Sequence, residues 1–155
     1  MAFEQTQEGS DDWATHACNL SGYLRTLYQQ TEELIDLDTA ISLARGSLDT
    51  TLAGNAPRHI RLGNLTACLI ARFDSTVSFE DLEECVKMGN EAKDATPKEH
   101  TEWPARLYDL RAIMQRRYQM TPDLDNLDEA IELTQETEPP EDLQRAEFFY
   151  RAALF

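Results

Sequence analysis

This chain of 155 residues lacks the features of a membrane or secreted protein. No stretch approaches the run of about 18 apolar residues that a membrane span needs. The N-terminal segment 1–8 has neither a basic start nor an apolar core, so it does not resemble a secretory signal. We therefore expect a cytoplasmic protein that does not bind membranes.

Cysteine, glycine and histidine are scarce as well. The three cysteines, Cys18, Cys68 and Cys85, are odd in number and widely spaced, which argues against a disulfide framework. The six glycines are scattered, so no glycine-rich loop for phosphate is present. His16 lies near Cys18, but no second His/Cys cluster completes the four ligands of a zinc site. We expect no metal, no cofactor, no catalytic residues and no enzymatic activity.

Basic residues are few, and they limit the kind of partner. The chain holds 14 Lys and Arg against 29 Asp and Glu, for a net charge of −15. Binding to nucleic acids depends on clustered Lys and Arg, so a nucleic-acid partner is excluded. The same charge disfavours anionic membrane surfaces. A protein or peptide, basic or weakly charged, is the expected partner.

The chain does have internal repetition. Offset by 45 residues, it matches itself without gaps, which predicts repeats over 13–57, 58–102 and 103–147, a flexible tail over 1–12 and the start of a fourth unit over 148–155. The whole chain 1–155 is expected to be a single repeat domain. The apolar columns include Leu20, Leu65 and Leu110; Leu24, Leu69 and Met114; and Tyr28, Phe73 and Tyr118.

Within each repeat the apolar residues follow the helical spacing of three and four. This predicts an all-α fold of antiparallel helix pairs, with the nine residues of those three columns in the core. The expected helices span 13–30, 36–51, 58–74, 81–94, 104–119 and 126–137. Asp36, Asp81 and Asn126 share one column, and we predict them as N-caps of the second helices.

Two segments, Asp81–Val86 and Asp123–Leu133, together with Arg117-Tyr118, resemble tetratricopeptide repeats. The likeness is greatest to the lengthened repeats upstream of caspase-like CHAT domains in fungal proteins. The resemblance implies an α-solenoid, here with a period of 45 residues instead of 34. Pro122 stands where that family has glycine, and HEAT or armadillo arrays remain an alternative. No Cys–His dyad of a CHAT protease is present.

The resemblance implies a protein–protein interaction scaffold whose first helices line a groove that binds a peptide or protein. It also fits the regulatory part of a larger CHAT-type protein. Two alternatives are a structural, self-assembling module and a small enzyme or ligand carrier. Two polar columns are candidate partner-binding residues: His16, Arg61, Arg106 and Arg151, and beside them Asn19, Asn64 and Asp109. For the first column, ion pairs between repeats are the favoured interpretation.

Aromatic residues gather in two places. Trp13, Trp103 and Phe148 share a column in which Arg58 is the exception, and packing is favoured there over a peptide pocket. Segment 146–155 begins a fourth first helix that is apolar on several sides. An exposed apolar segment of this kind usually marks an interface. We therefore expect either a longer parent chain or a homodimer through this C-terminal helix.

Overall fold

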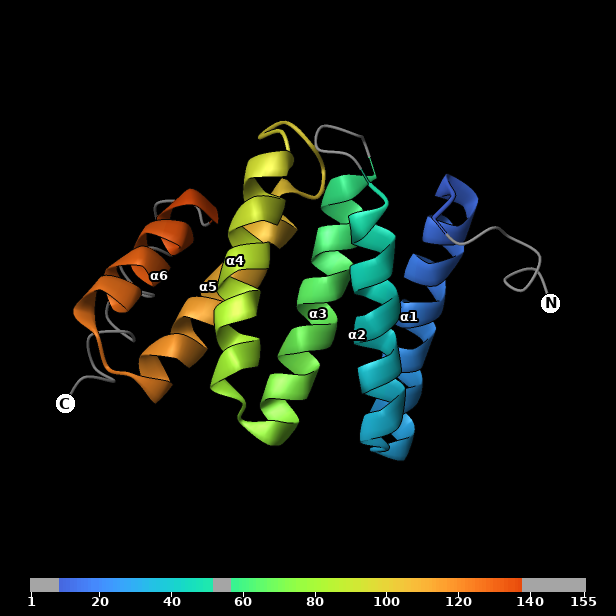
Figure 1. Cartoon of the computed structure of the whole chain (residues 1–155). Helices are drawn as coiled ribbons and strands as arrows, with labels where there is room; N and C mark the ends of the chain where they lie inside the picture. The colour runs from blue at the N-terminus through green and yellow to red at the C-terminus, as the bar shows by residue number, and fades with distance from the viewer. Residues whose placement is uncertain (1–8, 52–56, 138–155) are drawn as a thin grey trace. The chain divides into compact units, whose positions relative to one another are not determined.

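The computed structural model describes residues 9–51 and 57–137, and all regular structure within these ranges is helical (Figure 1). The prediction of an all-α protein is confirmed. No described helix is long and apolar enough to cross a membrane. The helices are α1 (Asp11–Thr31), α2 (Leu34–Asp49), α3 (Arg58–Thr76), α4 (Phe79–Ala95), α5 (Trp103–Met120) and α6 (Leu124–Thr137).

Each helix boundary lies within two residues of its predicted position. The second helix of each pair begins at Leu34, Phe79 and Leu124, which are 45 residues apart. Helices α1 and α2, α3 and α4, and α5 and α6 pack as hairpins. The chain divides into two compact units, which we call the N-terminal unit (Met1–Ala95) and the C-terminal unit (Thr96–Phe155).

In the N-terminal unit, α3 packs against α1, α2 and α4. Small residues on α1 and α2 allow close approach of the backbones, and larger apolar side chains of α2, α3 and α4 fill the space between them. The buried apolar residues there are Ala14, Ala17, Leu37, Ala40, Ile41, Ala44, Leu48, Leu62, Leu65, Cys68, Leu69, Phe73, Leu82, Cys85, Met88 and Ala92. In the C-terminal unit they are Leu107, Leu110, Ile113, Met114, Ala130 and Leu133.

The prediction of the core was wrong for four of its nine residues. Leu20, Leu24 and Tyr28 of α1 are only half-buried, as is Tyr118 of α5. Helix α1 instead buries its small face, which includes Ser21. Within the N-terminal unit, α3 packs against α1, α2 and α4 and buries its predicted core residues Leu65, Leu69 and Phe73, whereas the described part of α1 packs against α2 and α3.

The turns inside the hairpins differ because of one residue. Glu32 and Val77, 45 residues apart, end α1 and α3 in the left-handed conformation, with φ of 59° and 55°. The equivalent residue in the third hairpin is Pro122, whose ring fixes φ near −65° and excludes that conformation. Helix α5 therefore ends differently, with Thr121 in an extended conformation.

The predicted N-cap column was wrong by three residues. Helix α4 begins at Phe79, so Asp81 lies inside its first turn, and the Asp81 amide donates to Ser78 Oγ at 3.4 Å. Asp123 has the corresponding role before α6, where its Oδ1 accepts from the backbone amide of Asp125 at 3.1 Å. Asp81 is buried instead because its carboxylate pairs with Arg72 of α3, at 2.6 Å.

The aromatic column at the start of the first helices has a structural counterpart. Trp13 of α1 lies against Gly46 of α2, so closely that a Cβ on Gly46 would sit 2.8 Å from the ring. In the next hairpin, Arg58 occupies the position of Trp13, and its Nε donates to Glu91 at 2.9 Å. Gly46 and Glu91 are also 45 residues apart, so an apolar contact in one hairpin is replaced by an ion pair in the next.

Candidate functional site

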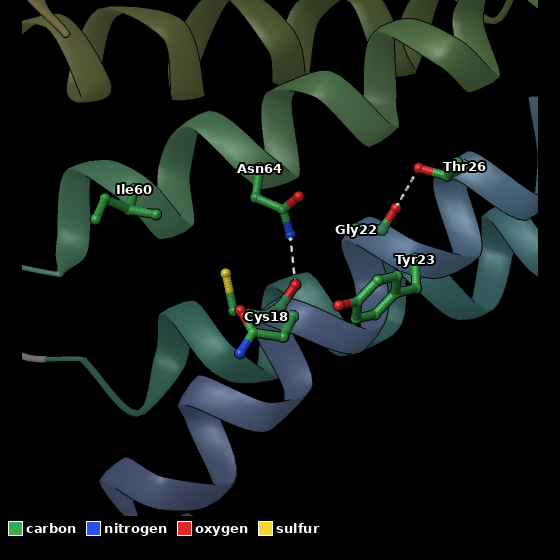
Figure 2. A pocket seen from close by; sticks show the side chains of 7 residues that line it. Cys18, Gly22, Tyr23, Thr26, Ile60 and Asn64 are labelled. Carbon is green, nitrogen blue, oxygen red and sulfur yellow. Dashed lines mark hydrogen bonds between the residues drawn. The ribbon is translucent and has the colours of Figure 1, made fainter.

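A groove of about 440 Å³ lies between α1 and α3 in the N-terminal unit (Figure 2). The residues that line it carry no formal charge, although the chain carries −15 overall. They are Cys18, Asn19, Gly22, Tyr23 and Thr26 of α1 and Ile60 and Asn64 of α3. This volume falls within the range of about 300–1,000 Å³ that is typical of ligand pockets.

Asn64 is held in place by the backbone of α1. Its Nδ2 donates to Cys18 O at 3.1 Å and to the Ser21 hydroxyl, and Figure 2 shows the amide pointing from α3 toward α1. The Ser21 hydroxyl donates to the same carbonyl at 2.9 Å. Asn64 Oδ1 has no hydrogen-bond partner among the described residues. It is therefore a fixed acceptor at the groove wall, suited to a backbone N–H.

Gly22 lies in the middle of α1, beneath Asn64. A glycine inside a helix costs about 0.5–1 kcal/mol relative to alanine, and the equivalent positions in the other two repeats hold Ala67 and Ala112. A Cβ on Gly22 would meet only Asn64 Oδ1, at 3.7 Å, which is an ordinary contact. Packing therefore does not require glycine here. Its effect is to deepen the groove next to the free acceptor.

Two apolar side chains stand at the edges of the groove. Tyr23 of α1 is 74% exposed and Ile60 of α3 is 49% exposed. In Figure 2, the Tyr23 ring lies beside Gly22 on α1, and Ile60 extends from the first turn of α3. Exposed aromatic and aliphatic side chains beside a fixed polar group are the elements that a peptide-binding groove combines.

The thiol in the groove is a weak nucleophile. Burial raises the pKa of Cys18, and the opposing effects of Arg61, Asn64 and Ser47 are smaller. The reactive form of cysteine is the thiolate. Cys18 is therefore protonated at neutral pH, and its chemical role in the groove is that of a small apolar surface.

The predicted site residues fall into different environments. Asn19 is exposed and lines the groove, and Asn64 lines it from the facing helix. His16 is half-buried, with its Nδ1 2.7 Å from Asp12 O one turn earlier on α1. The column of Asn19 and Asn64 therefore meets at one groove, whereas His16 does not line it.

Arg61 lies in the interior of the unit, with 3% of its surface exposed. Its guanidinium donates to Ser47 O at 3.3 Å and to the hydroxyl of Thr51, at the C-terminal end of α2, and its Nη2 reaches Thr15 Oγ1 at 3.4 Å. The C-terminal end of a helix carries partial negative charge, which offsets the buried cation. The arginine thus joins α1, α2 and α3 through hydrogen bonds, and no carboxylate among the described residues pairs with it as the ion-pair interpretation expected.

In the C-terminal unit, Arg106 and Asp109 of α5 pair with each other at 3.3 Å. Arg106 also reaches Glu102 at 3.5 Å. Burial raises the pKa of Asp109, against the opposing effect of Arg106. Arg151 lies outside the described residues, as does the C-terminal segment 146–155 predicted to form a dimer contact.

A second hollow, along α2, has a different character. It is lined by several charged residues, among them Asp38, Arg45 and Arg72. Arg45 pairs with Glu84 of α4, its Nε at 3.0 Å, and Arg72 pairs with both Asp38 and Asp81. The arginines that line this second hollow therefore form ion pairs between helices, and the uncharged groove is the better candidate for a ligand site.

Sequence reasoning found two of the groove residues and missed five. Asn19 and Asn64 were marked by their shared column. Gly22 carried a signal too, because it breaks a column that otherwise holds alanine. Cys18, Tyr23, Thr26 and Ile60 carried none, since their counterparts 45 residues away are of other types.

Family models, curated proteins and solved structures gave no match to this chain. The groove residues themselves are the basis for assigning a function. They combine the Asn64 amide, whose Nδ2 is held by α1 and whose Oδ1 is open to a ligand, with the exposed side chains of Tyr23 and Ile60.

Proposed function

We propose that this protein is a helical-repeat interaction module that binds an extended peptide segment of a partner protein in the groove between α1 and α3. The observation that carries the proposal is the uncharged groove with a fixed Asn64 amide, whose Oδ1 has no hydrogen-bond partner within residues 9–51 and 57–137. A peptide strand offers backbone N–H groups to such an acceptor and side chains to Tyr23 and Ile60.

The repeat arrangement supports this function. Three hairpins whose second helices begin 45 residues apart fit a tetratricopeptide-like solenoid, in which first helices line the groove. The candidate groove lies between two first helices, α1 and α3. The predicted column of Asn19 and Asn64 contributes side chains there, whereas Arg61 contributes to the stability of the scaffold.

The test uses a library of unstructured peptides of about 12 residues, screened against the full chain. Peptides that bind the wild-type protein are measured again with Tyr23→Ala, and with Tyr108→Ala as the matched control. Tyr108 is an exposed tyrosine of α5, 60% accessible, so both changes remove the same group from a helix surface. Loss of an aromatic contact residue costs more than about 1 kcal/mol, so Tyr23→Ala should weaken binding roughly fivefold or more.

Gly22→Met is the second variant, because it places a long side chain on the groove floor without touching the core. It should abolish binding while the helical circular dichroism stays unchanged. The proposal fails if no peptide binds more tightly than about 1 mM. It also fails if Tyr23→Ala and Tyr108→Ala weaken binding equally.

A further inference from the structure

The hairpin turns of the N-terminal unit expose apolar side chains. Leu34 and Ile35 begin α2, and Val77 and Phe79 flank the turn into α4. All four are exposed, Ile35 at 68% and Val77 at 56%. We call these four residues the hairpin-end surface. Figure 1 shows the α1/α2 and α3/α4 turns at the same end of this unit.

The two turns are tied to each other. The hydroxyls of Tyr28 on α1 and Ser75 on α3 form a hydrogen bond. Arg72 of α3 pairs with Asp38 of α2 at 2.9 Å. These contacts bring the ends of both hairpins together, so the apolar side chains of both belong to one end of the unit and can contact the same partner.

Val77 is the unusual member of this surface. It ends α3 with φ of 55°, a conformation that costs an L-residue roughly 1–2 kcal/mol and that glycine or asparagine adopts more easily. The β-branch of valine makes this position a genuine outlier. Its side chain is exposed, so burial does not offset the cost. A strained backbone conformation retained at an exposed apolar residue indicates that the Val77 side chain has a role other than packing within the fold, such as contact with another molecule.

The surroundings of the surface are acidic. Segments 27–39 and 72–84 contain nine Asp and Glu and a single basic residue, Arg72. All three nitrogens of the Arg72 guanidinium donate hydrogen bonds: Nε and Nη2 to Asp81, and Nη1 to Asp38. Glu32, Glu33 and Glu80 are exposed beside the apolar residues. An apolar patch with a negative rim is complementary to an apolar segment with positive flanks.

We propose that the hairpin-end surface docks a basic amphipathic segment of a partner protein, with apolar side chains against Ile35, Val77 and Phe79 and Lys or Arg beside the glutamates. This surface is separate from the groove between α1 and α3. A second copy of this chain is disfavoured as the occupant, because it would bring the same acidic rim against itself. An amphipathic segment recognises a partner by placing its apolar face against apolar side chains of that partner.

The probe is a fluorescent Leu/Lys amphipathic peptide of about 14 residues, or about four helical turns. A peptide of the same composition in scrambled order removes the apolar face and keeps the charge. Binding to the full chain is measured by anisotropy and mapped by amide chemical shifts. The amphipathic peptide should bind at least about tenfold more tightly than the scrambled one, and the shifts should concentrate at residues 31–36 and 75–81.

Two variants separate the rim from general attraction to an acidic protein. Glu32→Gln with Glu80→Gln, and Asp49→Asn with Asp94→Asn, each remove two negative charges. The second pair lies at the opposite ends of α2 and α4, at exposed positions. The first pair should weaken peptide binding several-fold and lower its salt dependence, and the second should change it little.

The apolar contacts are tested by Ile35→Ser with Val77→Asn, since asparagine tolerates the conformation of Val77. This double variant should fold and lose about tenfold or more in affinity for the amphipathic peptide. Equal weakening by both charge pairs, tight binding of the scrambled peptide, or shifts centred on Asn64 would each overturn the proposal. Tyr23→Ala should leave this binding unchanged, so the outcome is independent of the groove between α1 and α3.

Discussion

Two of the helix-interior glycines of the N-terminal unit, Gly22 of α1 and Gly46 of α2, should respond in opposite ways to the same substitution. Alanine in place of glycine inside a helix stabilises by about 0.5–1 kcal/mol. At Gly22 the new Cβ has only Asn64 Oδ1 nearby, at 3.7 Å. We therefore expect Gly22→Ala to realise the full gain, which for a chain of this size is a rise in melting temperature of roughly 1–4 °C.

At Gly46 the same methyl group meets the Trp13 ring at 2.8 Å. Trp13 is half-buried, and its ring must move to make room. Overpacking of this kind costs about 1–3 kcal/mol, which exceeds the helix-propensity gain. Gly46→Ala should therefore lower the free energy of unfolding, by up to roughly 2 kcal/mol.

A double-mutant cycle isolates the contact. In a Trp13→Ala background the obstacle is absent, so Gly46→Ala should become stabilising by about as much as Gly22→Ala. The measurement is urea unfolding followed by circular dichroism for the four members of the cycle. Stabilisation by Gly46→Ala in the wild-type background, or additivity across the cycle, would refute the Trp13–Gly46 packing.

Three further predictions concern the core and the buried charges. Asp81→Asn, which leaves Arg72 without its buried partner, should cost about 2–4 kcal/mol in a denaturant melt; Asp38→Asn, on the exposed side of the same arginine, should cost less than about 1 kcal/mol. Leu110→Ala, at a fully buried position of α5, should cost about 2–5 kcal/mol, and a loss below about 0.5 kcal/mol would contradict its burial. Burial raises the pKa of the Cys68 thiol to about 11. The unfolded state therefore loses this proton at a lower pH than the folded state, so the free energy of unfolding should fall between about pH 9 and 11. Cys68→Ala should flatten this part of the pH profile relative to wild type.

The helices followed from the sequence because their causes are local. Apolar spacing of three and four residues depends on the neighbours along the chain. The breaks near Glu32, Val77 and Pro122 lie where the 45-residue register predicts them. The error in the N-cap column has a local explanation as well. Both Ser78 and Asp81 are suitable cap residues; Ser78 accepts from the first turn of α4, and Asp81 lies inside the helix, where it pairs with Arg72 nine residues earlier.

Burial of the polar columns did not follow from the sequence. Arg61 and Asn64 are three residues apart, on one face of α3, yet Arg61 is interior and Asn64 lines the groove. Periodicity defines which residues share a face, but not which neighbour that face meets at each turn. The end of α2 covers α3 at Arg61, and α1 approaches it at Asn64.

The sequence by itself determined the all-helical class and the helix limits to within two residues, since these depend on local spacing, and it aligned positions 45 residues apart. Only the tertiary structure decided what equivalent positions contact. Trp13 with Gly46, and Arg58 with Glu91, are the same pair of positions in two hairpins, joined once by packing and once by charge. Each partner lies 33 residues from the other. Such a pair is selected by the geometry of the packed helices, and neither residue reveals its partner alone.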